Sequence, residues 1–313
     1  MTSIFYEAKN TSKHGYLLLV IKATEALSMY DPLASNSLAE LNKFSDQFLT
    51  RGLSIHSLAV TFRFLRAKYD ILLALGASAG IGAAIAADLV KNGFVVVALA
   101  RREERLRENQ RALPENLQSQ YHPRKCDVAN ENEVKDTFAW VETKFGGTDV
   151  LVNNAGVAAV GVELSAADNT QAIRNVVGTN VMGAVYCVRE AFNSMKKRNF
   201  DGHVVIINSV AGHYVPIVPI GSMNIYPASK FAVTAMVETY RQEFANAGTK
   251  VKVTSISPGA VLTEVLPNME SMKEAGHPLL NSEDISNAVL FVLSTPPHVQ
   301  VHELTIRPVG EKL

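Results

Sequence analysis

Five short runs of apolar residues, separated by longer stretches with helical periodicity, constrain the fold of this chain more than any other feature. The runs are Ile71–Leu75, Val95–Leu99, Val150–Val152, Val204–Ile207 and Val251–Ile256. A strand that is apolar at every position is buried on both faces, as in a parallel sheet with helices on each side. The alternation therefore predicts an α/β fold built on a single doubly wound parallel sheet.

The segments between these runs have the length and periodicity of crossover helices. They lie around Ile81–Lys91, Glu131–Lys144, Gly183–Lys197 and Ala228–Ala245. A last helix near Asp284–Leu293 ends before a pair of prolines, and the alternating run Val299–Ile306 predicts a final strand. One domain spanning residues 71–313 accounts for the whole pattern.

Residues 1–70 differ in character from the rest, with scattered serine, asparagine and threonine. Their helical periodicity is intermittent, as at Leu38, Leu41, Phe44 and Phe48. Three interpretations remain open: one or two amphipathic helices laid on the main domain, a loosely ordered extension, or sequence joined in error to the true start of the gene. We treat the segment as an atypical N-terminal extension of uncertain structure.

The charge balance argues against a general attraction to nucleic acid or to an anionic membrane, because thirty basic residues match thirty acidic ones. Cys126 and Cys187 have no metal-ligand spacing around them and are interpreted as buried apolar residues in a reducing compartment. The longest early apolar run, Tyr16 to Ile21, is too short for a membrane span or a secretory signal. The sequence therefore predicts a cytoplasmic protein without a transmembrane anchor.

A glycine-rich turn directly follows the first apolar run. It reads Gly76-Ala77-Ser78-Ala79-Gly80-Ile81-Gly82 and continues into a helical stretch. Glycines here permit a tight turn and let backbone N–H groups approach a pyrophosphate at the helix N-terminus. Strand, turn and helix in this order predict a dinucleotide site, although three residues rather than one separate the first two glycines.

Arg101 and Arg102 follow the second apolar run, where an NAD-binding protein commonly has an acidic residue. A guanidinium presents a planar fork of donors to a phosphate, so we predict NADP(H), as NADP+ or NADPH, to be the cofactor. The alternative is that both arginines belong to the mixed-charge helix face of residues 101–111, where glutamates offset them.

Tyr226 and Lys230, in the run Tyr-Pro-Ala-Ser-Lys, lie one turn apart on one face of a predicted helix. A free phenol titrates near pH ~10, and a cation beside it in a dry cleft could lower the pKa by about 3 units. Pro227 suits the first turn of such a helix, where its missing N–H would have no partner. The pair is a hypothesis for a proton-transfer site, although the same spacing also occurs by chance on solvated helices.

Further motifs lie at or just beyond the carboxyl ends of strands, where a doubly wound sheet binds its ligand. They are Asp127 after Lys125-Cys126, the run Asn153-Asn154-Ala155-Gly156, Ser209, and Pro258-Gly259 through Thr263. Together with Asn180, Tyr226 and Lys230, they make residues 71–313 resemble the short-chain dehydrogenase/reductase family. The resemblance implies a Rossmann fold, a nicotinamide cofactor and an oxidoreductase acting on CH–OH groups.

The resemblance also implies a role for each matching residue. In the catalytic set, Tyr226 would be the acid/base, Lys230 would bind the nicotinamide ribose and lower the Tyr226 pKa, Ser209 would hydrogen-bond the substrate oxygen, and Asn180 would hold a relay water. Besides Tyr226 and Lys230, the cofactor set is Gly76, Ser78, Gly80, Ile81 and Gly82 in the turn, Arg101 and Arg102, Asp127 at the adenine, Val128, Asn153 stabilising the sheet beside the cofactor, and Pro258, Gly259 and Thr263 around the nicotinamide.

The finer pattern resembles the insect NADP-dependent farnesol dehydrogenases and the member-eleven-like 17β-hydroxysteroid and ketone reductases of this family. It rests on the glycine turn, on Ala100-Arg101-Arg102, and on residues 223–230 and 295–304. The chain departs from the family pattern at Leu75, where threonine is usual, and in its long leader. Seventeen positions separate Ser209 from Tyr226, several more than the family's usual gap, and this insertion is expected to reshape the substrate wall.

Segments 212–225 and 261–280 are expected to cover the substrate, and their composition argues for an apolar ligand. Their apolar residues are Val215, Ile217, Val218, Ile220, Met223, Val261, Leu262, Val265, Leu266, Met269 and Met272. We predict an isoprenoid, fatty or steroid-like alcohol or carbonyl substrate, with farnesol dehydrogenase-like activity first. The alternatives are a 17β-hydroxysteroid or ketosteroid reductase, loops that merely pack on the domain, and a non-catalytic nucleotide-binding partner protein.

Family members commonly pair through the helices that here would be Gly183–Lys197 and Ala228–Ala245, so the resemblance implies a homodimer or homotetramer. His213 and His298 are interpreted as surface or loop residues. No metal and no nucleic acid is expected as a ligand.

Overall fold

The computed structural model describes residues 69–217, 221–264 and 269–311, with the backbone alone at 269–271. Our expectations for the N-terminal extension lie outside the described residues. The described residues form a seven-stranded sheet in the order β3-β2-β1-β4-β5-β6-β7, with every pair parallel. The strands are β1 (Ile71–Leu75), β2 (Val95–Ala100), β3 (Tyr121–Lys125), β4 (Val150–Asn153), β5 (His203–Ile207), β6 (Lys252–Pro258) and β7 (Glu303–Ile306). The predicted doubly wound parallel sheet is confirmed.

Two strands differ from the sequence prediction, and both lie at an edge of the sheet. β3 was not among the predicted strands because its sequence, Tyr-His-Pro-Arg-Lys, has no apolar run. Pro123 is tolerated there because an edge strand need not donate every backbone hydrogen bond. At the other edge, the predicted strand was Val299–Ile306. Only Glu303–Ile306 pair with β6, so β7 is four residues long.

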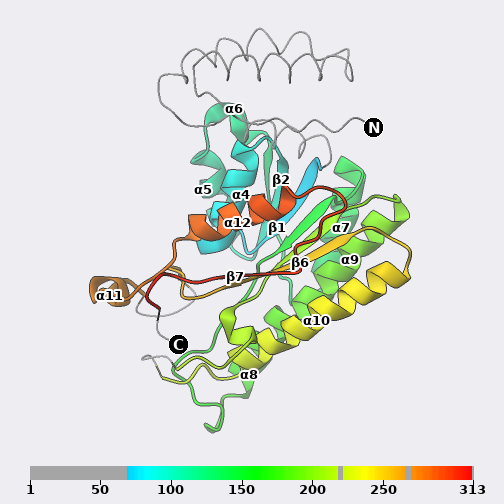
Figure 1. Ribbon diagram of the computed structural model, residues 1–313. Coiled ribbons are helices and arrows are strands. Elements are labelled where there is room, and N and C mark those ends of the chain that lie inside the picture. Colours follow the sequence, from blue (N-terminus) through cyan, green and yellow to red (C-terminus); the bar gives the residue numbers. More distant parts are fainter. Residues whose placement is uncertain (1–68, 218–220, 265–268, 312–313) are drawn as a thin grey trace, which may run out of the picture. The chain divides into compact units, whose positions relative to one another are not determined.

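Helices cover both faces of the sheet, which explains the continuously apolar central strands (Figure 1). Helices α4 (Gly80–Lys91), α5 (Glu103–Arg111) and α12 (Ser282–Leu293) pack on one face. Helices α7 (Glu131–Phe145), α9 (Ala184–Lys197) and α10 (Tyr226–Asn246) pack on the other. Successive residues of β1 alternate between the two apolar layers: Leu72 belongs to the first and Leu73 to the second.

Shorter helical elements complete the described part of the chain. They are α6 (Glu115–Gln118), α8 (Thr170–Val177), the π-helical turn η2 (Gly178–Gly183), the 3₁₀ turn η3 (Val210–Gly212) and α11 (Met269–Glu274). η2 runs directly into α9, so the helix predicted from Gly183 begins earlier in the structure. A π-helical turn within a longer helix is frequent at functional sites, and this one contains Asn180.

Local sequence explains where the longer helices begin and end. The side chain of Asn130 accepts hydrogen bonds from two backbone N–H groups at the start of α7, and Gly146, with φ of 81°, ends that helix. α10 begins at Tyr226 with Pro227 in its first turn, as predicted. Asn281 and Asp284 form a reciprocal capping box at the start of α12.

Several other expectations concern the chain as a whole. Cys126 and Cys187 are free and buried, as expected. Within the described residues, no helix is both long enough and apolar enough to cross a membrane. The boundary of the N-terminal extension, the cytoplasmic location and pairing through α9 and α10 stay predictions.

A buried carboxylate, Asp149, fastens the start of the sheet. Its Oδ2 atom accepts hydrogen bonds from the backbone N of Asp70 at 2.8 Å and of Ile71 at 3.0 Å. Its Oδ1 atom accepts a charged hydrogen bond from Arg198 Nη1 at 2.9 Å. One side chain before β4 therefore holds the beginning of β1 and the end of α9.

Replacing Asp149 by Ala should lower the free energy of unfolding by about 2–4 kcal/mol, because two partly buried N–H donors and a partly buried guanidinium lose their acceptor. Urea unfolding followed by far-UV circular dichroism measures the change. Glu104→Ala is the matched control, since it removes a carboxylate whose ion pair with Arg111 is exposed, and it should cost less than about 1 kcal/mol. Equal losses in the two variants would contradict this account of Asp149.

Candidate active site

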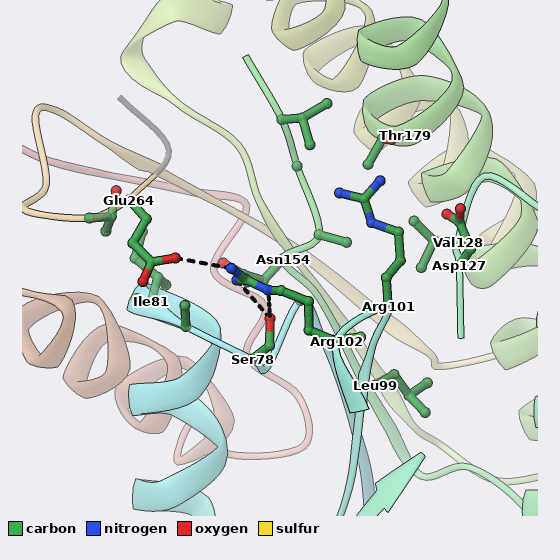
Figure 2. Close-up of a pocket in the computed structure, with 18 of the residues that line it drawn as sticks. Ser78, Ile81, Leu99, Arg101, Arg102, Asp127, Val128, Asn154, Thr179 and Glu264 are labelled. Atoms are coloured by element: carbon green, nitrogen blue, oxygen red, sulfur yellow. Dashed lines mark hydrogen bonds and ion pairs between the residues drawn. The ribbon is translucent and has the colours of Figure 1, made fainter. Parts of the chain in front are cut away.

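A cavity of about 350 Å³ lies at the carboxyl ends of β1, β2 and β3 (Figure 2). We call it the nucleotide cavity. Its walls include most of the residues that the sequence assigned to cofactor binding: Gly76, Ser78, Gly80, Ile81, Arg101, Arg102, Asp127, Val128 and Thr263. The parallel sheet therefore brings together motifs that are up to 187 positions apart in the sequence, from Gly76 to Thr263.

The glycines of the turn are required by conformation and by close contact. Gly76 and Gly80 have φ of 69° and 52°, a region that other residues rarely adopt. A Cβ atom at Gly82 would lie 2.3 Å from the Gly76 carbonyl oxygen and 2.5 Å from Asn154 Nδ2. Gly82 thus does not line the cavity but lets helix α4 pack against the turn.

The N-terminus of α4 points its free donors at the nucleotide cavity. Its first residues, Gly80 and Ile81, line the cavity, no side chain caps the helix, and its first turn has no acidic residue. Unpaired backbone N–H groups and the helix dipole favour an anion at this place. The residues present therefore fit the pyrophosphate of a dinucleotide cofactor.

Arg101 and Arg102 both line the nucleotide cavity. Arg102 donates to Ser78 Oγ from Nε at 3.3 Å and from Nη2 at 3.0 Å (Figure 2). Glu103 pairs with Arg107 and Glu104 with Arg111, so neither offsets Arg101 or Arg102, whereas Glu264 pairs with Arg102 at 3.2 Å. Binding of a cofactor phosphate by the two arginines stays a prediction.

The other residues assigned to the cofactor differ in their position. Asp127 lines the nucleotide cavity while its Oδ1 atom accepts a hydrogen bond from the backbone N of Ala129 at 3.1 Å. Asn153 is buried within β4 and lines neither this cavity nor the larger one described next. Asn154 lines both cavities instead and donates from Nδ2 to the Leu75 carbonyl at 3.0 Å, joining β1 to β4 at the turn.

A larger cavity of about 700 Å³, the substrate cavity, holds the predicted catalytic side chains. Ser209, Tyr226 and Lys230 line it together with Pro258 and Gly259. Ile81, Asn154, Gly156 and Thr263 line both cavities, so the two share a wall. The cavity with Arg102 and the cavity with Tyr226 are therefore neighbours at the same edge of the sheet.

Lys230 is almost completely buried, with 7% of its surface exposed. Its Nζ atom donates to the Ile207 carbonyl at the end of β5, at 3.0 Å, and lies 5.7 Å from the centre of the Tyr226 ring. Burial lowers the pKa of this ammonium to about 8, because removal from water disfavours its charged form. Lys230 is thus fixed beside Tyr226, as the helical spacing predicted.

The expected lowering of the Tyr226 pKa is not what the structure gives. Burial raises the pKa of the phenol above its ordinary value, and a hydrogen bond with the Ser209 side chain lowers it only in part. The spacing argument counted the attraction of the neighbouring ammonium but not the removal of the phenol from water. In this structure the neutral phenol is therefore the favoured form.

Asn180 lines neither cavity and instead bonds the groups around it. Its Oδ1 atom accepts from the backbone N of Val157 at 2.9 Å. Its Nδ2 atom donates to the Val157 carbonyl at 2.9 Å and to Ser229 Oγ at 3.0 Å. The side chain connects the loop after β4 to α10 within one turn of Tyr226, and its role in holding a relay water stays a prediction.

The walls of the substrate cavity are largely apolar. Of the predicted apolar residues, Ile217, Met223, Val261 and Met272 line it, whereas Val215 and Leu262 do not. Val218, Ile220, Val265 and Leu266, and the side chain of Met269, lie outside the described residues. Part of the insertion between Ser209 and Tyr226 therefore forms a wall of this cavity, as expected.

Sequence reasoning missed several residues at the two cavities. Tyr214, His277 and Glu311 line the substrate cavity, and Glu264 lines the nucleotide cavity. Tyr214, Glu264 and His277 lie in the segments 212–225 and 261–280 that were expected to cover the substrate, so only Glu311 had no sequence signal. His213 bonds Ser257 and Glu303 and lines neither cavity. No group of three or more possible metal ligands occurs in the described parts of the chain.

The family model of the short chain dehydrogenases matches residues 70–274. The farnesol dehydrogenase of Aedes aegypti is 59% identical over 242 residues, covering 77% of this chain and 97% of that protein. Dehydrogenase/reductase SDR family member 11 of Homo sapiens is 38% identical over 251 residues, covering 76% of this chain and 94% of that protein. The chain belongs to the short-chain dehydrogenase/reductase family and is an oxidoreductase that acts on CH–OH groups.

Solved structures agree with this assignment. The closed form of a serine dehydrogenase complexed with NADP+ has a TM-score of 0.68 and 31% identity, covering 78% of this chain and 96% of that one. Serine dehydrogenase from Escherichia coli has a TM-score of 0.64 and 30% identity, covering 78% and 100%. The fold and the binding of a nicotinamide cofactor follow from this membership.

Replacing Gly82 by Ala should weaken cofactor binding, because the new methyl group meets the backbone of the turn. Overpacking of this kind costs about 1–3 kcal/mol, and if half of that cost opposes cofactor binding, the affinity falls roughly two- to tenfold. Titration of NADPH by fluorescence measures the loss. Gly178→Ala is the control, since its Cβ would come no closer than 3.8 Å to Ala129. Wild-type affinity in Gly82→Ala would contradict the close packing of the turn.

Proposed function

We propose that this protein is an NADP(H)-dependent oxidoreductase that interconverts an apolar alcohol and its aldehyde or ketone, with farnesol as the first candidate substrate. One observation carries the proposal: Ser209, Tyr226 and Lys230 line a largely apolar cavity that shares a wall with a cavity lined by Arg101 and Arg102. The 59% identity to a farnesol dehydrogenase supports the same substrate class.

The proposed acid/base is Tyr226. In reduction its phenol would give a proton to the oxygen of the carbonyl compound, and in oxidation the phenolate would take the proton from the alcohol. Ser209, already hydrogen-bonded to Tyr226, would hold the same oxygen in place. When bound, the nicotinamide supplies or accepts the hydride. Because burial keeps the phenol protonated, the side chains favour reduction at neutral pH and oxidation at higher pH.

Preference for NADP(H) over NAD(H) is proposed from the groups around Ser78. The Ser78 hydroxyl and the Arg102 guanidinium already contact each other at 3.0 Å, and Arg101 lines the same cavity without a hydrogen bond or ion pair among the described residues. A 2′-phosphate placed there would receive charged donors from Arg102, and Arg101 would add positive charge to the same cavity. No carboxylate at the end of β2 would repel it, since Ala100 holds that position.

An apolar substrate is proposed from the chemistry of the substrate cavity. Ile217, Met223 and Met272 supply apolar surface, and the volume of about 700 Å³ falls within the usual range for small-molecule sites. The charged groups are already engaged: Lys230 bonds Ile207, and Glu311 accepts from the backbone N of Ala260 at 3.1 Å and pairs with Arg307. Lys230 and the His277 imidazole are the only basic side chains in the described wall, so a substrate with its own carboxylate or phosphate would find few cationic partners there.

A substrate panel tests the proposal. With the full-length protein, farnesol and other isoprenoid or fatty alcohols should be oxidised, with NADP+ giving a higher kcat/KM than NAD+. Ketosteroids belong in the panel as the second candidate, and serine and simple sugars are the polar controls. Turnover of the polar compounds alone would contradict the apolar substrate class, and equal use of both cofactors would contradict the arginine assignment.

Replacing Tyr226 by Phe should reduce kcat by roughly a hundredfold or more, because general acid–base catalysis contributes about 10²–10⁴-fold. NADPH affinity should stay within about a factor of three of wild type. Thr239→Val serves as the control on the same helix, since the hydroxyl of Thr239 only bonds the Ala235 carbonyl. Retained turnover in Tyr226→Phe would refute the acid/base role. NADPH binding by the wild type without turnover of any compound would favour a non-catalytic partner protein.

A further inference from the structure

Glu264 bridges two elements that are far apart in the sequence. It follows Thr263 in the segment after β6, and its carboxylate contacts Arg102 before α5 (Figure 2). The same carboxylate also contacts Arg105 within α5. The distance from Arg102 Nη1 to Oε2 is 3.2 Å, and Arg105 Nη1 lies 2.9 Å from Oε1 and 2.8 Å from Oε2. The carboxylate therefore forms a shared ion pair with two arginines at the wall of the nucleotide cavity.

This contact involves the guanidinium that is proposed to hold the 2′-phosphate. All three guanidinium nitrogens of Arg102 are engaged, with Nε and Nη2 on Ser78 Oγ and Nη1 on Glu264. A phosphate that approaches Ser78 and Arg102 has to take over some of these donors. It also carries negative charge toward a carboxylate, which opposes its binding.

Glu264 can leave Arg102 without losing its charge partner. Its side chain is 58% exposed, and both of its oxygens face Arg105 Nη1 within hydrogen-bond distance. The two arginines hold the pKa of this carboxyl below its ordinary value, so it is ionised at neutral pH. Arg105 does not line the nucleotide cavity, and a move toward Arg105 would free Arg102 for another anion.

We propose that Glu264 is a specificity-determining residue: its carboxylate competes with the 2′-phosphate of the cofactor for Arg102 and is displaced onto Arg105 when that phosphate binds. This inference rests on the proposed NADP(H) dependence. Its consequence is that Glu264 weakens binding of NADP(H) but leaves NAD(H), which has no 2′-phosphate, unaffected. The same residue thereby limits the preference that Arg101, Arg102 and Ser78 create.

A purely structural role of the Glu264 ion pair would change the cofactor affinities in a different way. If the ion pair served only to hold the segment after β6 against α5 around the whole dinucleotide, its removal would weaken NADPH and NADH alike. Competition predicts the opposite sign and restricts the effect to ligands with a 2′-phosphate. The contact with Arg102 itself, rather than with Arg105 alone, favours competition.

The test compares wild type, Glu264→Gln and Glu104→Gln by titration with NADPH, NADH, 2′,5′-ADP and 5′-AMP. Glu264→Gln should bind NADPH and 2′,5′-ADP roughly two- to fivefold more tightly, the size expected for one exposed ion pair. Its affinity for NADH and 5′-AMP should change by less than about 1.5-fold. Glu104→Gln is the control: it also removes one negative charge, from the first turn of α5, where Glu104 pairs with Arg111. Its affinity for all four ligands should equal that of wild type.

Arg105→Gln tests the competition in a second way, with Glu264 intact. In Arg105→Gln the carboxylate has only Arg102 left, so NADPH should bind more weakly than in wild type. Adding Arg105→Gln to Glu264→Gln should then have little further effect, because nothing remains to be displaced. An equal loss in both backgrounds would overturn the competition.

The outcomes separate the two proposals. Wild type that binds NADPH and NADH equally would refute the proposed NADP(H) dependence. Wild type that prefers NADPH, combined with a Glu264→Gln variant that binds NADPH no more tightly, would overturn the role of Glu264 alone. Weaker binding of all four ligands by Glu264→Gln would also overturn the competition and would favour a purely structural contact.

Discussion

The parallel alignment of the strands is the constraint on which the site depends. It places every carboxyl end at one edge of the sheet, and the strand order β3-β2-β1-β4-β5-β6-β7 runs outward from β1 and β4 in opposite directions. The chain connections that follow β1 and β4 therefore run in opposite directions along the sheet. Gly76 and Asn154, which directly follow these two strands, lie at this topological switch point. The nucleotide cavity lies toward β2 and β3, while Ser209 and Thr263 approach from β5 and β6.

The sequence predicted the elements whose signal lies within a short run of residues. It did not predict the elements and side chains that depend on partners far away in the chain. Apolar runs identified the five central strands, because burial on both faces leaves a signal within each strand. β3 has no such signal, since an edge strand with Pro123 is held mainly by its pairing with β2. Glu264 and Glu311 were missed for a related reason: their partners, Arg102 and Ala260, are 162 and 51 positions away. No spacing rule connects them.

The pKa values of Tyr226 and Lys230 depend on burial, which their spacing in the sequence does not predict. A helix repeat predicts that two side chains share a face, but it does not describe the water around them. Burial lowers the pKa of Lys230 to about 8 and raises the pKa of Tyr226, so each neutral form gains relative to its charged form. A bound polyanionic cofactor would favour the ammonium again, and the ammonium would then favour the phenolate. In this view the acidity of the proposed acid/base depends on the cofactor as well as on the helix.

The segment after β6 connects these elements physically. Carboxylates hold it at both ends: Glu311 accepts from the backbone N of Ala260, and Glu264 pairs with Arg102 and Arg105. Between these points, Val261 lines the substrate cavity and Thr263 lines both cavities. Glu264 is therefore one residue away from a side chain that lines both cavities. If Glu264 is displaced as proposed, we expect the choice of cofactor to affect the shape of the substrate wall.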